Sequence, residues 1–265
     1  MSAAPATHSR GDVTEDAFLG GALNILQLRN GYRAGLDAVM LAAAVPADAS
    51  RPLRVLDVGA GVGTAGLCLA HRAPFAEVVL LEKEPQLAAL AAENIARNDL
   101  AARVRVVTGV VGGGATDWRA LGLDEESFGH VIANPPFHDT DAGTLPPDTL
   151  KAGAHAMPDG ELEAWARFMA RMTAPGGEAT MIHKVDALAR VLAVLEPRFG
   201  ALKILPLHPR QGAPAHRVLV QGVKGSRGPL QLLPGFVLHA EGNAFTPAAQ
   251  EILRAAAALP MGGTS

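Results

Sequence analysis

Residues 54–63 read Arg-Val-Leu-Asp-Val-Gly-Ala-Gly-Val-Gly, and this stretch decides the fold. Its first half, Arg54 to Val58, is typical of a buried strand, and Thr64 to Arg72 has the apolar spacing of a helix. The glycines between them let the backbone turn tightly and approach a ligand closely. The stretch therefore predicts a strand, a ligand-binding loop and a helix in succession.

The same alternation continues along the chain, which implies right-handed crossovers and a parallel sheet covered on both faces. The final two strands have no helix between them, which predicts a closing hairpin. We therefore expect an α/β, doubly wound fold with a mostly parallel seven-stranded sheet, an antiparallel C-terminal hairpin and helices on both faces. The further strands are expected at 77–81, 103–107, 128–133, 178–183 (entered through a turn at 174–177), 203–207 and 217–223, and the helices at 86–98, 161–172, 185–195 and 246–258.

Composition limits the class of protein. The 265 residues are about half apolar, which suits a single globular unit. Cys68 is the one cysteine, so neither a disulfide framework nor a cysteine-rich zinc site is expected, and we expect no metal. No stretch has the length of a membrane span or the pattern of a signal peptide, so the expected location is the cytoplasm, without a membrane partner.

Charge is unevenly distributed along the chain. Residues 183–227 hold eight basic and two acidic residues, a net charge of +6, so the remaining residues carry −9. A basic segment of this kind is typical either of a solvated surface or of contact with nucleic acid. The candidate RNA-binding residues are Lys184, Lys203, Arg210, Arg217, Lys224 and Arg227.

The glycine loop after the first strand indicates a nucleoside cofactor. Glu82, at the end of the second strand, can accept hydrogen bonds from both hydroxyls of a ribose. The sequence from Gly61 to Gly66 also fits the dinucleotide pattern G-x-G-x-x-G, so the loop alone is ambiguous. Asp57 favours a methyl donor, because its carboxylate would repel a pyrophosphate but can receive the ammonium of a methionine group.

Asn134-Pro135-Pro136-Phe137 follows the fourth strand, at the edge of the sheet where the glycine loop also lies. Two prolines make a stiff loop whose carbonyl directions are fixed. An aromatic amine is a poor nucleophile, and we expect the Asn134 side-chain oxygen and the Pro135 carbonyl to accept its two N–H bonds and turn its lone pair toward the methyl group. Phe137 would stack on the base, swung out of its helical stack.

With these residues in place, the chain resembles the Rossmann-like class I methyltransferases that use S-adenosylmethionine. More narrowly, it is similar to the bacterial family that methylates the 6-amino group of adenine beside the anticodon of tRNA for valine. The likeness rests on residues 31–37 (Gly-Tyr-Arg-Ala-Gly-Leu-Asp), 55–63, Leu81-Glu82-Lys83, Glu93-Asn94, 134–137, 214–220 and 238–247.

The resemblance implies S-adenosyl-L-methionine as cofactor, tRNA as partner and transfer to an adenine 6-amino group. It implies that residues 32–37 cover the methionine end of the cofactor, that the glycine loop holds it and that Glu82 binds its ribose. After the third strand many relatives have an acidic residue, whereas this chain has Thr108-Gly109, so backbone groups must serve there. The expected cofactor-binding set is Tyr32, Arg33, Gly35, Asp37, Asp57, Gly59, Ala60, Gly61, Gly63, Glu82, Lys83, Gly109 and Asn134, and the catalytic set is Asn134, Pro135, Pro136 and Phe137.

Several alternatives stay open. Phe137-His138 also resembles ribosomal RNA methyltransferases that act on the guanine 2-amino group, and a protein glutamine amide poses the same chemical problem as an aromatic amine. Two alternatives belong to other functional classes. An NAD-dependent oxidoreductase would use the overlapping glycine pattern, and a non-catalytic RNA-binding module would retain the fold without its activity. The chain is expected to act as a monomer or homodimer.

The domain organisation follows from these motifs. Residues 1–16 are expected to form a disordered tail, 17–50 an N-terminal lid or substrate segment, 51–227 the cofactor-binding core and 228–265 a C-terminal extension.

Overall fold

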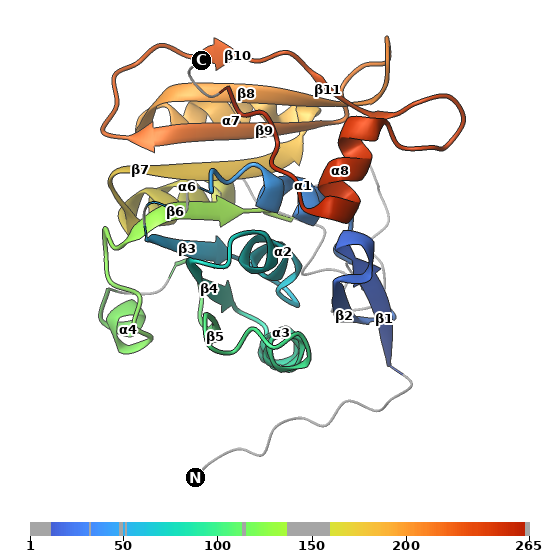
Figure 1. Ribbon diagram of the computed structural model, residues 1–265. Helices are drawn as coiled ribbons and strands as arrows, with labels where there is room; N and C mark the ends of the chain where they lie inside the picture. The colour runs from blue at the N-terminus through green and yellow to red at the C-terminus, as the bar shows by residue number, and fades with distance from the viewer. Residues whose placement is uncertain are drawn as a thin grey trace, which may run out of the picture.

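A nine-stranded sheet forms the centre of the molecule (Figure 1). The computed structural model describes residues 12–31, 33–47, 50, 52–112, 115–136 and 160–262. The strand order is β10-β8-β9-β7-β6-β3-β4-β5, and β11 also pairs with β8. The strands are β3 (Leu53–Val58), β4 (Ala76–Glu82), β5 (Val104–Thr108), β6 (Phe128–Ala133), β7 (Thr173–Lys184), β8 (Phe199–Arg210), β9 (Arg217–Lys224), β10 (Gln231–Leu232) and β11 (Phe236–His239).

The sheet confirms the predicted topology and corrects its size. Only β9 runs antiparallel to its neighbours β7 and β8, so the expected C-terminal hairpin is present. Two additional strands enlarge the predicted seven-stranded sheet, because β10 and β11 both pair in parallel with the outer edge of β8. The predicted turn at 174–177 lies within β7, where the register with β6 shifts between Phe128 and His130.

Helices cover both faces of the sheet, as predicted. Successive residues of β4 separate the two layers, since Val78 and Leu80 pack in one apolar cluster and Val79 and Leu81 in the other. This alternation is expected of a strand buried on both faces. One layer holds α1 (Leu36–Ala43), α2 (Thr64–Arg72), α3 (Pro85–Arg97) and α8 (Pro247–Ala255), and the other holds α4 (Ala115–Ala120), α6 (Glu161–Met172) and, after the 3-10 turn η2 (Val185–Ala187), α7 (Leu188–Leu195).

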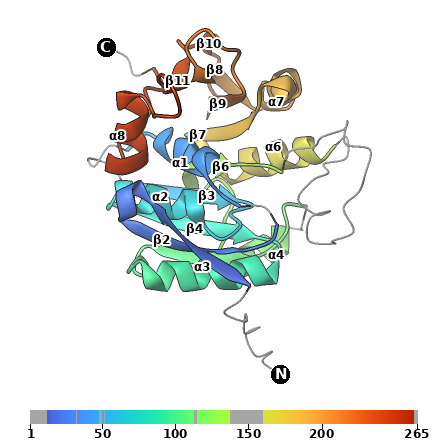
Figure 2. The same ribbon diagram turned by 90° about the vertical axis from the view of Figure 1, so that its right-hand side faces the viewer.

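The N-terminal part forms a hairpin that the sequence did not predict. Strands β1 (Val13–Phe18) and β2 (Leu23–Leu28) pair antiparallel around the 3-10 turn η1 (Leu19–Gly21), and the hairpin lies beside α3 and α8 (Figures 1 and 2). Residues 13–16 therefore belong to a strand, and the predicted tail at 1–16 was wrong for them. Their polar side chains suggested disorder, but Asp16 accepts a hydrogen bond from Gln27 and Glu15 pairs with Arg97.

Within the described part of the chain, no helix combines the length and the apolarity that crossing a membrane requires.

Candidate active site

Asp57, Glu82 and Asn134 lie at or next to the carboxyl ends of β3, β4 and β6, the edge toward which Figure 2 looks. Val58, the last residue of β3, pairs with Leu81 on β4 and with Ala133 on β6. The loops that follow these strands therefore start side by side. Parallel α/β sheets bind their ligands in this position.

Asp57 lies near the end of β3 with its carboxyl group buried. Its Oδ2 accepts a hydrogen bond from the backbone N–H of Gly66, in the first turn of α2, at 2.9 Å. The pKa of this carboxyl group is raised from 3.8 to about 7, chiefly by burial; the hydrogen bond from Gly66 lowers it, and the nearby charge of Glu82 adds a smaller increase. A cation placed against Asp57 would favour its ionised form. The ammonium group of a methionine moiety fits this requirement.

Glu82 ends β4 and is only 5 % exposed. Its Oε2 accepts the backbone N–H of Gly61 at 2.7 Å and its Oε1 accepts that of Glu84 at 2.9 Å. A carboxylate oxygen can accept more than one hydrogen bond, so each oxygen retains capacity for a hydroxyl donor. The Glu82 side chain is thus fixed beside the glycine loop, where its two oxygens can accept hydrogen bonds from the two hydroxyls of a ribose.

The glycine loop takes conformations that favour glycine. Gly59, Gly61 and Gly63 have φ values of 66°, 57° and 90°. The loop is attached to β4 by the bond from the Ala60 N–H to the Leu81 carbonyl, at 3.0 Å. A Cβ atom on Gly61 would meet no heavy atom within 4 Å, which leaves space for close approach of a ligand to the backbone.

Trp165 contacts this loop from the opposite layer, and the sequence reasoning missed it. A Cβ atom on Gly59 would lie 2.3 Å from Cη2 of Trp165, in the first half of α6. The tryptophan is partly buried, so its ring forms a wall beside the loop. One feature of the sequence could have indicated Trp165: it is an aromatic residue near the start of the helix expected at 161–172, the first helix after the Asn-Pro-Pro-Phe sequence.

The tetrapeptide begins directly after β6. Asn134 follows Ala133 and is half-buried, while Pro135 is buried. Because Ala133 pairs with Val58, Asn134 and Gly59 leave the sheet at neighbouring positions. Two other residues considered for the site, Phe137 and His138, lie outside the described residues.

His183 is a further residue at this edge that the sequence reasoning did not select. It is buried on β7, two positions beyond Met181, the partner of Ala133. Burial lowers the pKa of His183 from 6.5 to about 4. The ring is therefore neutral near pH 7 and offers hydrogen bonding rather than charge.

Two more residues of the predicted cofactor set, Gly109 and Lys83, lie near the same edge. Gly109 follows β5 and donates its N–H to the Glu82 carbonyl at 2.9 Å, and Lys83 is exposed after β4. Gly35 precedes α1, whereas Tyr32 lies outside the described residues. Arg33 turns toward the hairpin and pairs with Asp16 at 2.5 Å.

Asp37 and Arg217, predicted for cofactor and RNA respectively, pair with each other. The Nε atom of Arg217 lies 2.8 Å from Oδ2 of Asp37, and both side chains are partly buried. The ion pair joins the start of β9 to the first turn of α1. It therefore fixes the start of α1 relative to the sheet.

The basic segment does not form one surface. Lys184, Arg210 and Arg217 lie at or next to the carboxyl edge, because β7 and β8 end there and β9 begins there. Arg210 also holds the C-terminal extension through the carbonyl groups of Ala240 and Gly242. The other three lie elsewhere: Lys203 donates to the Gly262 carbonyl, Lys224 binds Glu126 and the Thr173 carbonyl at the opposite edge, and Arg227 follows Lys224.

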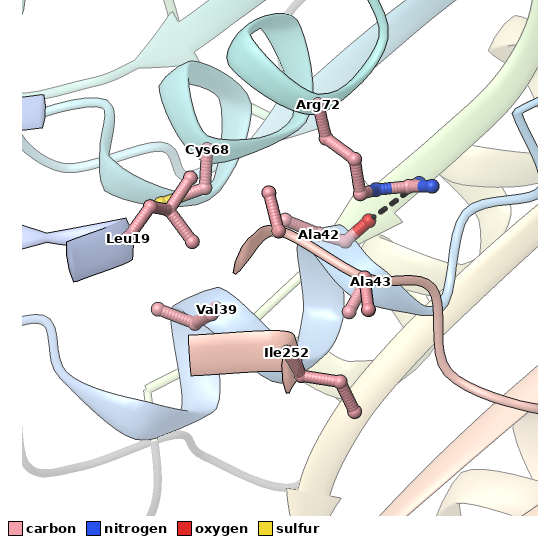
Figure 3. A pocket seen from close by; sticks show the side chains of 9 residues that line it. Leu19, Val39, Ala42, Ala43, Cys68, Arg72 and Ile252 are labelled. Carbon is pink, nitrogen blue, oxygen red and sulfur yellow. Dashed lines mark hydrogen bonds between the residues drawn. The ribbon is translucent and has the colours of Figure 1, made fainter. Parts of the chain in front are cut away.

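A small apolar pocket lies between α1, α2 and α8, where Arg72 donates a hydrogen bond to the Ala42 carbonyl (Figure 3). Cys68 lines it, and burial raises the pKa of the Cys68 thiol to about 12, so the thiol is protonated. None of the lining residues belongs to the predicted site. The pocket therefore lies apart from the predicted site, within the packing beneath α8.

Comparison with known proteins finds similarity to methyltransferases. A family model described as the methyltransferase small domain matches residues 36–164. A tRNA1(Val) (adenine(37)-N6)-methyltransferase of Bacteroides fragilis is 29 % identical over 192 residues, which cover 71 % of this chain and 76 % of the relative. A protein of the same name from a Shewanella strain is 32 % identical over 126 residues, 46 % of this chain and 49 % of that one.

Two solved structures extend the comparison. A crystal structure from Agrobacterium tumefaciens, described as a predicted O-methyltransferase, has 33 % identity and a TM-score of 0.70, covering 84 % of this chain and 98 % of that chain. The 16S rRNA N2 G1207 methyltransferase of T. thermophilus, in complex with AdoMet and guanosine, has a TM-score of 0.52 at 20 % identity and covers 80 % and 50 % of the two chains. The second likeness concerns the fold alone.

Proposed function

The chain belongs to the S-adenosylmethionine-dependent class I methyltransferases, and from this premise we propose that it methylates the exocyclic 6-amino group of an adenine in tRNA. The position of Asn134 carries the proposal, because Asn134 leaves β6 beside the point where Gly59 leaves β3. An amine held by Asn134 would then lie next to the cofactor loop. The names of the curated relatives support adenine in tRNA as the acceptor.

The chain's own residues position the acceptor. Bound cofactor supplies an electrophilic methyl group on a sulfonium. The Asn134 side-chain oxygen and the Pro135 carbonyl accept the two N–H bonds of the amine, which makes the nitrogen more tetrahedral and directs its lone pair along the line of attack. The proton leaves the nitrogen after transfer, so no strong base is required beforehand. The buried ring of Pro135 keeps its carbonyl in a fixed direction.

Two carboxylates hold the cofactor. Asp57 receives the ammonium group, and this opposite charge offsets the cost of ionising a buried carboxyl group. Glu82 accepts the ribose hydroxyls while its bonds from Gly61 and Glu84 fix its position.

The surface around the edge favours nucleic acid over a protein acceptor. Lys184 and Arg210 place positive charge beside the carboxyl ends of β7 and β8, and phosphate groups are the natural partners of such charge. A glutamine amide in a protein would give no reason for it. A tRNA substrate also implies action in the cytoplasm.

Methyl transfer with labelled S-adenosylmethionine, followed by mass spectrometry of the nucleosides, tests the proposal. The acceptors are tRNA and ribosomal RNA from a strain that lacks the gene, together with a protein extract from that strain. We expect N6-methyladenosine in tRNA. Exclusive formation of N2-methylguanosine in ribosomal RNA, or of methylglutamine in protein, would overturn the choice of acceptor.

A further inference from the structure

We propose that Asn94 is a positioning residue that couples the N-terminal hairpin to the glycine loop, so that the cofactor and the hairpin strengthen each other's placement. Asn94 lies on α3, outside every set of site residues considered above, and its side chain is completely buried. The inference rests on S-adenosylmethionine as cofactor and is independent of which base is methylated.

The Asn94 side chain bridges two segments that are far apart in the sequence. Its Oδ1 accepts the backbone N–H of Leu26 on β2 at 2.7 Å. Its Nδ2 donates to the Leu26 carbonyl and to the Val62 carbonyl, both at 3.0 Å. The carboxamide therefore pairs with Leu26 as a neighbouring strand would. At the same time it fixes the peptide group between Val62 and Gly63 in the glycine loop.

Asn98, one helical turn later, provides an internal comparison. Its Oδ1 accepts the N–H of Asn24 at 2.9 Å and its Nδ2 donates to the Asn24 carbonyl at 3.0 Å. Asn94 and Asn98 thus hold alternate residues of β2 by the same pair of bonds. They differ in two respects. Asn94 is completely buried, whereas Asn98 is partly exposed. Asn94 also binds the glycine loop, whereas the second bond of the Asn98 Nδ2 goes to the Asn94 carbonyl within α3.

Gln27 continues the connection from β2 to the segment before α1. Its Oε1 accepts the N–H of Ala34 at 2.7 Å, and its Nε2 donates to the Ala34 carbonyl at 3.1 Å. The side chain is only 2 % exposed. Buried amide hydrogen bonds therefore connect Val62 to Asn94 and Asn94 to Leu26, and partly buried ones connect the next residue, Gln27, to Ala34. Ala34 lies between the predicted cofactor residues Arg33 and Gly35.

This arrangement makes the hairpin sensitive to the loop. Removing the Asn94 amide would leave the buried N–H and C=O groups of Leu26 and the Val62 carbonyl without this partner, a state that proteins avoid. A cofactor that orders the peptide at Val62 therefore favours the docked hairpin, and a docked hairpin favours the loop that binds the cofactor. Coupling of this kind is reciprocal, and about tenfold in affinity is a typical size.

Asn94→Ala and its matched control Asn98→Ala test the inference. We expect S-adenosylmethionine affinity to fall about tenfold in Asn94→Ala and to stay within about twofold in Asn98→Ala, because both remove bonds to β2 but only the first releases Val62. Hydrogen exchange supplies a second measurement. Cofactor should slow exchange at residues 23–28 and 33–36 in the wild type and in Asn98→Ala, but only near the glycine loop in Asn94→Ala.

A purely structural role for Asn94 predicts a different result. Both variants would then melt at lower temperature, with the same cofactor affinity and the same cofactor-dependent protection of 23–28 as the wild type, and this would overturn the proposal. Should Asn94→Ala fail to fold, Gln27→Leu tests the next step of the connection. It should keep the protection of 23–28 by cofactor and lose that of 33–36; retention of both would equally contradict the coupling.

These outcomes are separable from failure of the proposed function. Cofactor affinity and hydrogen exchange are measured without RNA, so an acceptor other than tRNA adenine would leave them unchanged.

Discussion

The cofactor half and the acceptor half of the edge differ in how closely the structure follows the sequence motifs. Around the glycine loop, Glu82 accepts the N–H of Gly61, and Asp57 accepts the N–H of Gly66 in the first turn of α2. On the acceptor side, the basic segment divides, with Lys184 at the carboxyl edge and Lys224 at the opposite edge. The topology of a parallel sheet brings the residues at the carboxyl ends of its strands to one edge. In the antiparallel pair of β8 and β9, the charged residues at the two ends of β9 lie at opposite edges. A motif tied to a strand end is thus a better guide to a site than a run of charge.

The largest effect is expected from Asn134→Ala, which separates the two halves directly. Loss of one of the two acceptors for the amine should lower kcat at least about 100-fold. The affinity for S-adenosylmethionine, measured by calorimetry, should fall far less than kcat, because Asp57 and Glu82 still hold the cofactor when Asn134 is lost. Unchanged turnover would show that the acceptor does not bind at the end of β6.

Gly59→Ala should weaken the cofactor half from within. The added Cβ would lie 2.3 Å from Cη2 of Trp165, and the residue has a φ of 66° that costs a non-glycine residue about 1–2 kcal/mol. We expect cofactor affinity to fall about tenfold or more. In the double variant with Trp165→Ala, part of the loss should be recovered, because the clash is removed while the strain in φ remains. Additive losses in the double variant would exclude the contact as the cause.

Asp57 should make cofactor binding depend on pH. With a pKa of about 7, its carboxyl group is mostly protonated at pH 6 in the free protein and ionises as the pH rises. The ammonium of the cofactor requires the ionised form, so affinity should increase about fivefold between pH 6 and pH 7. Asp57→Asn should bind more weakly with a flat profile. A similar slope in Asp57→Asn would assign the titration to another group.

The same shift predicts the stability of the free protein. Because the folded-state pKa is raised, the contribution of Asp57 is fully present below pH 4 and is lost as the pH rises through about 7. Thermal unfolding of the wild type and of Asp57→Asn between pH 5 and pH 8 measures this contribution of Asp57 to the free energy of unfolding. The wild type should lose stability relative to the variant as the pH rises; a gain would contradict the assignment.

The smallest effect is expected from single basic residues, and it tests the division of the basic segment. Lys184→Ala should raise the KM for tRNA a few-fold and lower the salt dependence of binding by about one unit. Lys224→Ala, at the opposite edge, should leave both within about twofold. Equal losses in the two variants would mean that the RNA extends over both edges.

Much of the core could be predicted because each step there is local. Thr64–Arg72, Phe128–Ala133 and Glu161–Met172 have the bounds expected from apolar spacing. The N-terminal hairpin could not be predicted in this way. Its strands are held by partners distant in the sequence, such as Asn94, which binds the backbone of Leu26. Local sequence patterns do not indicate such contacts.

The site shows the same limit. Asp57 and Glu82 were selected because each lies at or near the end of a strand, and in the structure they accept the backbone N–H groups of Gly66 and Gly61. Trp165 reaches Gly59 across a long stretch of chain, and the Asp37–Arg217 pair joins residues that the sequence had suggested for different ligands. Contacts between layers depend on how the helices pack, which strand and helix patterns leave undetermined.

Nucleoside analysis of tRNA from the source organism, with and without the gene, tests the central claim most directly. We expect N6-methyladenosine to disappear from one tRNA when the gene is deleted, to return with the wild-type gene and to stay absent with Asn134→Ala. An unchanged content of N6-methyladenosine, or its return with Asn134→Ala, would contradict the claim that the end of β6 positions an adenine amine for methylation.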